Sequence, residues 1–353
     1  MQRQDYRIMK MVFNDDKGDE SIGSTRIFVY NLHHWLSQLG YDVHLNDWTH
    51  YSGYDVALFG KNVEVEQIQK ARAQNPKLIC GCIHPSDITN QKREIMKQSD
   101  FFIVGCIEER DYYLRYSNNV FIFLDLERMF KKIKRHEDHE PIVLGYHGNL
   151  EHLTQIHPYL KPALEILAKE IPVRLLVVFN KRLGPWRVGR PDIEIEEVQW
   201  EIDTIQKQLL RCDIGLVPGL TPISPAEKRV MFNLLKCTQR RIISYRHDYL
   251  LRFKNTTNSG RAFVFHELGI PVISDFLPSS FHILADPKCG YLAHSKEGWL
   301  YALRDLCKSA EKRQKIAQNA LAEFQRHYDP LECSRRLYED VENLWKRLIL
   351  SPK

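Results

Sequence analysis

Short apolar runs alternate with segments of helical periodicity along most of this chain of 353 residues. The runs are rich in valine, isoleucine, leucine and phenylalanine, which is typical of strands buried on both faces. A helix between two such strands lets them lie side by side as parallel neighbours, and helices then cover both faces of the sheet. The alternation therefore predicts an α/β protein built from doubly wound parallel sheets.

The alternation occurs twice. In the first half, we expect strands at 6–13, 43–45, 56–59, 78–83, 101–104 and 120–122, with helices at 25–39, 63–74, 89–98 and 107–116. In the second half, we expect strands at 142–146, 173–179, 193–198, 214–217 and 271–273, with helices at 151–169, 202–211, 225–252, 298–309, 311–327 and 331–349. A further short amphipathic helix is expected between Ser259 and Gly269. The charged segment between the halves lacks strand character.

The two halves predict two Rossmann-like domains. We place the first at 1–124 and the second at 141–329, with a linker at 125–140. A final helix at 330–353 is expected to pack back on the first domain. Ligands of doubly wound domains bind at the carboxyl ends of the strands. Two such domains facing each other would therefore hold their ligands in a cleft between them.

Composition narrows the class of protein. No apolar run is long enough to span a membrane, and residues 1–7 lack the apolar core of a signal peptide. The eight cysteines form no Cys-x-x-Cys pair and have no zinc-like histidine spacing, so we expect buried, reduced thiols in a cytoplasmic protein. The net charge of +5 is too small to indicate nucleic-acid binding.

Positive charge is nevertheless concentrated in one stretch. Residues 225–254 contain eight lysines and arginines against two acids, Glu227 and Asp248, which leaves a local excess of six. Such a stretch attracts phosphates, an anionic glycan or the acidic inner face of a membrane. A solvated basic face is the alternative interpretation.

A candidate phosphate site lies just after this stretch. Ser259 and Gly260 open the short helix, Gly269 ends it, and a buried strand follows at 271–273. The first amides of a helix lack intrahelical acceptors and its dipole favours anions, so such a start can hold a phosphate. Lys254 and Arg261 would add positive charge beside it. An ordinary connection from helix to strand is the alternative.

Three segments of the second half occur in a familiar order. The first is Gly145-Tyr-His-Gly-Asn149, the second is 198–200 followed by a helix and the run 212–218, and the third is Lys254 with 259–274. In these segments the chain resembles the GT-B nucleotide-sugar glycosyltransferases, most closely the large retaining group called family four. The first half matches in outline only, through a strand, a loop containing Gly23, a helix, and the run 39–43.

The resemblance implies roles for particular residues. The second domain would bind the nucleotide sugar, and the first would bind the acceptor. Donor-binding positions would be Gly23, His147, Gly148, Gln199, Trp200, Lys254, Asn258, Ser259, Gly260 and Arg261; catalytic positions would be His84, Asp87 and Lys254. Retaining members carry two glutamates where this chain has Thr256 and Val264, so the donor sugar and the stereochemical outcome stay open. We expect no metal site and no cofactor.

The leading hypothesis is therefore a metal-independent glycosyltransferase of the hexosyltransferase type. It would use a nucleotide sugar in the cytoplasm or at the inner membrane face, on a glycan or lipid-linked acceptor of surface polysaccharide or glycolipid biosynthesis. Two alternatives remain, a catalytically inactive nucleotide-sugar-binding scaffold and a sugar-nucleotide epimerase. A nicotinamide-dependent dehydrogenase is disfavoured, because no Gly-x-Gly-x-x-Gly follows any expected strand.

Overall fold

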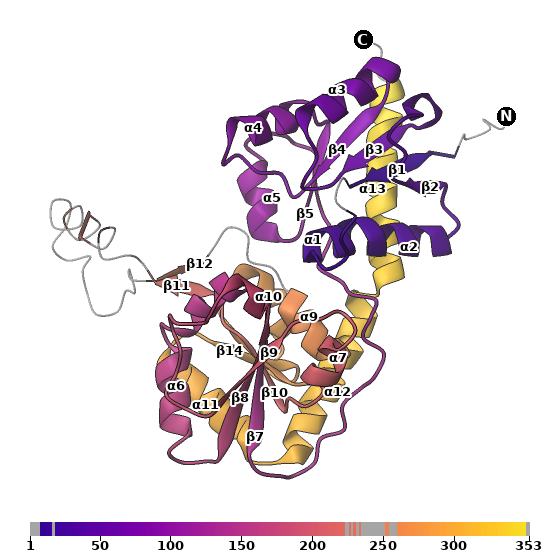
Figure 1. Cartoon of the computed structure of the whole chain (residues 1–353). Coiled ribbons are helices and arrows are strands. Elements are labelled where there is room, and N and C mark those ends of the chain that lie inside the picture. Colours follow the sequence, from indigo (N-terminus) through magenta and orange to yellow (C-terminus); the bar gives the residue numbers. More distant parts are fainter. Residues whose placement is uncertain are drawn as a thin grey trace. The chain divides into compact units, whose positions relative to one another are not determined.

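The computed structural model describes residues 8–15, 18–222, 226, 229–230, 233, 251–253 and 260–350. The chain divides into two units (Figure 1). The first unit contains residues 1–129, 258–260 and 325–353, and the second contains 130–257 and 261–324. Among the described helices, none is long and apolar enough to cross a bilayer.

The first unit is built on a parallel six-stranded sheet. Its order is β2-β1-β3-β4-β5-β6. The strands are β1 (Met11–Asn14), β2 (Val43–Leu45), β3 (Val56–Phe59), β4 (Ile79–Ile83), β5 (Phe101–Val104) and β6 (Val120–Ile122). Asn14 pairs with Phe59, and Phe59 pairs with Cys82, so the carboxyl ends of three adjacent strands lie in a row.

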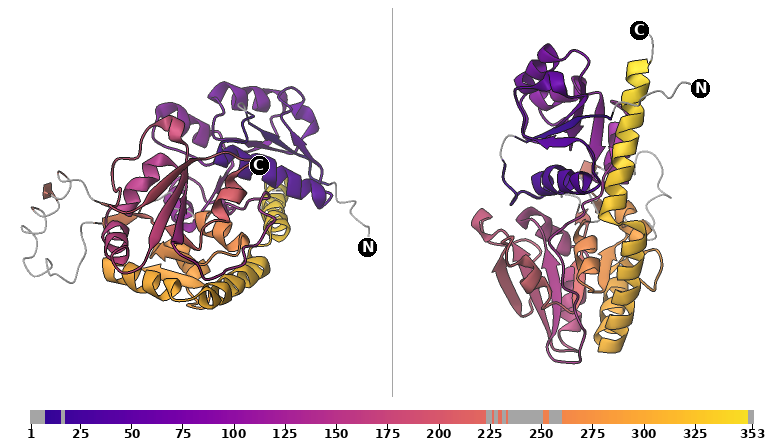
Figure 2. Two further views of the ribbon diagram at one scale, coloured as in Figure 1. Left: turned by 60° about the horizontal axis from the view of Figure 1, so that its bottom comes forward. Right: turned by 90° about the vertical axis from the view of Figure 1, so that its right-hand side faces the viewer.

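Helices cover both faces of this sheet. Alternate strand residues such as Val12 pack against α3 (Val65–Gln74), α4 (Asn90–Lys97) and α5 (Ile107–Tyr113). On the opposite face, Phe13 contacts His33 of α2 (Leu32–Gln38). The long helix α13 (Pro330–Leu350) lies beside α2, and its Tyr338 hydroxyl donates to the Met9 carbonyl at 3.0 Å (Figures 1 and 2). The last helix of the chain thus belongs to the first unit.

The second unit contains another parallel six-stranded sheet, of order β14-β13-β10-β7-β8-β9. The strands are β7 (Ile142–His147), β8 (Val173–Phe179), β9 (Ile195–Gln199), β10 (Ile214–Val217), β13 (Val272–Asp275) and β14 (Gly290–Ala293). A separate antiparallel pair joins β11 (Leu220–Pro222) to β12 (Leu251–Phe253). The order reverses direction at β7 and β10, as in other doubly wound sheets.

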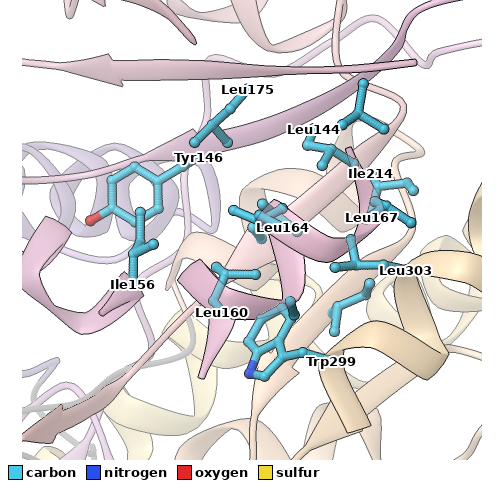
Figure 3. Close-up of a cluster of buried hydrophobic side chains, with 14 of the residues drawn as sticks. Leu144, Tyr146, Ile156, Leu160, Leu164, Leu167, Leu175, Ile214, Trp299 and Leu303 are labelled. Atoms are coloured by element: carbon cyan, nitrogen blue, oxygen red, sulfur yellow. The ribbon is translucent and has the colours of Figure 1, made fainter. Parts of the chain in front are cut away.

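Two layers of helices enclose the second sheet. On one face, α6 (Leu160–Leu167), α11 (Lys296–Cys307) and α12 (Ala310–His327) bury a core in which Trp299 packs with leucines of α6 (Figure 3). The other face carries α7 (Ile205–Leu209) and α9 (Gly260–Glu267). A Cβ atom at Gly215 would lie 2.5 Å from the Phe265 ring, so the bare backbone of β10 is what lets α9 pack this closely.

The prediction of an α/β protein with two doubly wound domains is confirmed, and several elements differ in detail. The helix expected at 25–39 is divided into α1 (Gly23–Thr25), a π-helical segment (Arg26–Asn31) and α2. The helix expected at 151–169 begins with a 3₁₀ turn (Leu150–Ile156) before α6. Helix α10 (Pro278–Leu284), strand β14 and the 3₁₀ turns at Tyr51–Gly53 and Lys181–Leu183 were not expected.

Two other predictions are corrected. Helix α9 is not amphipathic, because Ala262 through His266 are all buried and the helix is enclosed on every side. Residues 251–252 belong to β12 rather than to a helix. Most of the expected helix at 225–252, together with Lys254, Asn258 and Ser259, lies outside the described residues.

Candidate functional site

The turn after β7 lies against the first turn of α9. Gly148 has φ +148°, and a Cβ atom there would lie 3.0 Å from the Tyr146 hydroxyl and 3.4 Å from Cδ of Arg261. A side chain at this position would be strained and crowded at once. The glycine therefore lets the end of the central strand approach Arg261 directly.

Arg261 is held by fixed partners and keeps one donor unused. Its Nη2 donates to the Pro218 carbonyl at 2.8 Å and to Oε1 of Gln155 at 3.3 Å. The guanidinium carbon lies 5.4 Å from the centre of the Tyr146 ring. Its Nη1 is buried and has no hydrogen-bond partner in the described part of the chain. A positioned cation with a free N–H at a carboxyl sheet edge suits a bound anion.

His147 joins the same two elements. Its Nε2 donates to the Arg261 carbonyl oxygen at 3.3 Å, and its ring meets the Phe265 ring edge to face, with centroids 5.1 Å apart. The imidazole is half-buried. Three predicted donor-site residues, His147, Gly148 and Arg261, are therefore neighbours, although Arg261 lies more than 110 positions after the other two.

Asp275, the last residue of β13, shapes the adjoining turn. One of its carboxylate oxygens accepts from the amides of Gly219 and Leu220 at 2.7 and 3.0 Å, and the other accepts from the indole of Trp299 at 2.8 Å. Burial raises the pKa of this carboxyl, although the three donors and Arg261 oppose the shift. These hydrogen bonds fix the turn whose Pro218 carbonyl holds Arg261.

Gln199 and Trp200 lie where β8 and β9 end. The Gln199 side chain accepts from the amide of Lys181 at 2.9 Å and donates to the Trp200 carbonyl at 2.9 Å. The Trp200 amide donates to the Phe179 carbonyl, and the residue is half-buried. Gln199 therefore ties the ends of the two strands together and fixes the backbone of Trp200.

His84 follows β4 at the carboxyl edge of the first sheet. It has φ +49°, which is uncommon for a residue other than glycine and occurs often at functional sites. Its amide donates to the Ile103 carbonyl, and its ring packs edge to face on Phe28 with centroids 4.2 Å apart. Its Nδ1 lies 3.7 Å from Oε2 of Glu109. The imidazole is thus firmly positioned and still partly exposed.

A second carboxylate, Asp125, lies close to His84. A Cβ atom at Gly105 would lie 2.9 Å from Oδ2 of Asp125 and 3.6 Å from Cε1 of His84. This Oδ2 is buried and has no hydrogen-bond partner among the described residues, and burial raises the pKa of Asp125 to about 7, although His84 opposes the shift. Burial also acts to raise the pKa of Glu109, but His84 and the Gly105 amide lower it overall. The imidazole is therefore surrounded by acidic groups.

Asp87 and Gly23 have different surroundings from His84. Asp87 accepts from the hydroxyls of Tyr112 at 2.6 Å and Tyr116 at 2.8 Å, and these two bonds lower its pKa. A carboxylate held in its charged form in this way is a weak base, and its catalytic role stays a prediction. Gly23 begins α1, where a Cβ atom would lie 3.9 Å from Nη2 of Arg26.

Other residues at these edges gave no sequence signal or a weak one. Gln155 lies in a 3₁₀ turn that the sequence did not predict. Asp125 falls in the segment that we assigned to the linker, where an isolated acid carries no signal. Asp275 could have been found, because an acid that ends a buried strand needs hydrogen-bond donors. Tyr146 and Glu109 belong to no sequence motif, and only their contacts in the structure indicate a role at these sites.

Comparison with known proteins identifies the fold. No protein-family profile matches the chain, and no curated protein matches it. Among solved structures, sucrose-phosphate synthase from Thermosynechococcus elongatus is similar over 96% of this chain and 99% of that one, with a TM-score of 0.61 and 11% identity. The chain has the GT-B glycosyltransferase fold.

Two other similar structures are glycosyltransferases or bind a nucleotide. The Anabaena protein HepE, solved with UDP and glucose, is 11% identical with a TM-score of 0.55, over 95% of this chain and 100% of that one. The lipopolysaccharide outer core galactosyltransferase WaaB is 11% identical with a TM-score of 0.56, over 95% and 99%. The likeness at these identities concerns the fold.

Proposed function

We propose that this protein is a glycosyltransferase that moves a sugar from a nucleotide-sugar donor to a glycan or lipid-linked acceptor. The observation that carries the proposal is the buried Nη1 of Arg261, which has no acceptor among the residues that the structure describes. It lies beside Gly148 at the carboxyl edge of a doubly wound sheet, where ligands of this architecture bind. A diphosphate would supply the missing acceptor oxygen.

The same residues can stabilise the leaving group. When the bond between the sugar carbon and the diphosphate oxygen breaks, negative charge develops on the nucleoside diphosphate. We assign its stabilisation to Arg261, Lys254 and the start of α9 with Asn258, Ser259 and Gly260, without an obligatory metal ion. His147 and Gly148 would lie beside the phosphates. Gln199 and Trp200, at the ends of β8 and β9, would contact the base.

The acceptor side of the reaction is assigned to the first unit. The acceptor hydroxyl oxygen forms the new bond to the sugar carbon, and its proton must leave. In an inverting reaction a protein base takes the proton, and in a retaining one the departing diphosphate can take it. His84 is our choice for the group that contacts this hydroxyl, since its ring is partly exposed and oriented by Phe28 and Glu109. Asp87 is assigned to orienting the same loop.

We place this activity in surface polysaccharide or glycolipid biosynthesis in the cytoplasm. The similarity to WaaB, a lipopolysaccharide outer core galactosyltransferase, supports the substrate class. The seven described cysteines are all free, and five of them are buried, which suits a reducing compartment. The basic stretch 225–254 would contact the inner membrane face or a phosphate-bearing acceptor.

Calorimetric titration with UDP, GDP, ADP and CDP tests the donor site. We expect one of these diphosphates to bind, and Arg261→Met to weaken its binding by about 1.5–3 kcal/mol, the range for hydrogen bonds to charged groups. The control is Arg304→Gln, an exposed arginine of the same unit that pairs with Glu170. Binding of none of the four, or equal losses in both variants, would contradict the proposal.

A nucleotide-sugar-binding protein without transferase activity remains the second candidate. Val264, which stands where retaining relatives of this fold carry a glutamate, is buried inside α9 and offers no polar group to the donor sugar. Incubation with the nucleotide sugar of the diphosphate that binds separates the possibilities. Transfer or hydrolysis supports the enzyme, binding without turnover supports the scaffold, and an isomerised donor indicates an epimerase.

A further inference from the structure

A basic loop connects β8 to β9 in the second unit. Residues 180–191 contain Lys181, Arg182, Arg187 and Arg190, and the sequence has no acid between Glu170 and Asp192. All four cationic side chains are exposed. The loop therefore presents a dense group of positive charges to solvent.

Two large aliphatic side chains are exposed among these cations. Leu183 is 65% exposed and Val188 is 58% exposed. Between them, Trp186 is only 4% exposed within the core, and its indole N–H donates to the Val188 carbonyl at 2.7 Å. Gly189 has φ +82°, and a Cβ atom there would lie 3.1 Å from the Leu153 carbonyl oxygen. The loop is thus anchored at its centre, and this anchoring holds Leu183 and Val188 outside the core.

The charges of the loop are only partly compensated. Arg182 pairs with Glu201 at 2.7 Å, and Arg190 pairs with Glu197 while lying over the Trp186 ring. Arg187 has no ion pair or hydrogen bond within the described part of the chain. Lys181 donates to the Glu197 carbonyl and has no ion pair there either, so two of the four cations lack an acidic partner among the described residues. Since exposed ion pairs are weak, the paired arginines remain available to a competing anion.

We infer that this loop docks the protein on an anionic lipid surface. The cations select an anionic partner, and each one near such a surface adds to the attraction. The exposed leucine and valine select a lipid surface over a soluble polyanion, because only the lipid offers an apolar layer in which they can be buried. The inference goes beyond the proposed function and does not depend on it, since it rests on Leu183, Arg187 and Val188, to which no part in donor binding is assigned.

Vesicle co-sedimentation of the full-length protein tests the inference. We expect binding to vesicles of phosphatidylcholine mixed with phosphatidylglycerol, and little binding to phosphatidylcholine alone. Replacing both aliphatics, as Leu183→Ser with Val188→Ser, should weaken partitioning at least tenfold, and Arg187→Gln should weaken it about fivefold. The matched control is Leu348→Ser with Ile349→Ser, an aliphatic pair of α13 that is 45% and 52% exposed. Thermal unfolding checks that each variant is folded.

Each remaining outcome argues against the loop as a lipid-docking surface. Equal binding to neutral vesicles removes the role of the charges, and absence of binding to both mixtures removes the surface altogether. An equal loss of vesicle binding in the α13 control variant would mean that the loop is not the specific lipid-binding surface. If Arg187→Gln abolishes binding while the aliphatic double variant binds normally, the loop serves a soluble polyanion instead. The calorimetric test of nucleotide binding is a separate measurement from the vesicle test, so either proposal can fail while the other stands.

Discussion

The carboxyl edges of the two sheets have opposite hydrogen-bonding needs. At the edge of the first sheet, three buried oxygens have no partner among the described residues, namely Oδ1 of Asn14, Oδ1 of Asp15 and Oδ2 of Asp125. In the second unit, the groups beside Gly148 that lack a partner among the described residues are Nη1 of Arg261 and the hydroxyl of Tyr146, and both can donate. Sugar hydroxyls can donate to the first set, and phosphate oxygens can accept from the second. Two parallel six-stranded sheets thus carry different chemistry, because function depends on the residues at the edge rather than on the fold class.

The buried acids show the same contrast. Asp275 in the second unit accepts three hydrogen bonds, and all of them come from groups that are themselves buried. Asp125 in the first unit has a buried oxygen without a donor, and its pKa rises to about 7. The Asp275 carboxylate holds its turn in place, whereas the Asp125 carboxylate lowers the stability of the folded chain. An unpaired buried acid that persists in a structure is typical of a site that serves a ligand.

The largest expected effect separates the two edges by function. His84→Ala should lower the rate of sugar transfer by about 10²–10⁴-fold, the usual contribution of a positioned acid or base. Nucleoside diphosphate affinity should stay unchanged, because the donor site is assigned to the other unit. Steady-state kinetics and calorimetry measure the two quantities, and His50→Ala, an exposed histidine of the same unit, is the control. Equal losses of rate and affinity would indicate that His84 has only a packing role.

The next effect concerns Asp275. Asp275→Asn should lower the free energy of unfolding by about 1.5–3 kcal/mol, because an amide cannot accept from the two backbone amides and from the Trp299 indole in the same way. Denaturant titration of the variant and of the exposed Asp203→Asn control measures the difference. A loss no greater than that of the control would mean that the three hydrogen bonds contribute little.

The smallest expected effect is a gain in stability, from a substitution of Asp125. Asp125→Asn should raise the free energy of unfolding by about 1–2 kcal/mol at pH 8 and change it little at pH 4. The folded-state pKa of about 7 lies above the unfolded value, so the folded chain binds more protons between about pH 4 and 7. Stability contributed by this group therefore falls as the pH rises through that window, and the amide removes the loss.

Denaturant titrations at both pH values measure the gain from Asp125→Asn. The control is Asp111→Asn, a carboxylate whose side chain is 61% exposed. A variant that is less stable than the parent at pH 8 would show that the ionised Asp125 is stabilised by groups around His84, and the contrast with Asp275 would then disappear.

Much of the fold followed from local sequence patterns. The strands at 43–45, 56–59, 101–104, 120–122, 173–179 and 214–217 match the structure in both bounds. Four of these runs, 56–59, 101–104, 173–179 and 214–217, are almost wholly buried, so their composition alone distinguishes them. The sequence did not predict α10 and β14, which are short. It predicted α9 as an amphipathic helix, but the burial of this helix on all sides depends on Gly215 in β10, which lies 46 positions before Arg261. The pairing of His147 and Gly148 with Arg261 was proposed from a resemblance, and the contacts between them came from the structure.

The sequence by itself determined the class of fold and the edges at which polar residues gather, because hydrophobic periodicity and glycine placement are local properties. Only the tertiary structure decided which polar groups find partners. The unused N–H of Arg261, the unpaired oxygen of Asp125 and the saturated carboxylate of Asp275 all depend on residues far away in the chain. Hydrogen-bond satisfaction is a property of close packing between distant segments, and no local pattern encodes it.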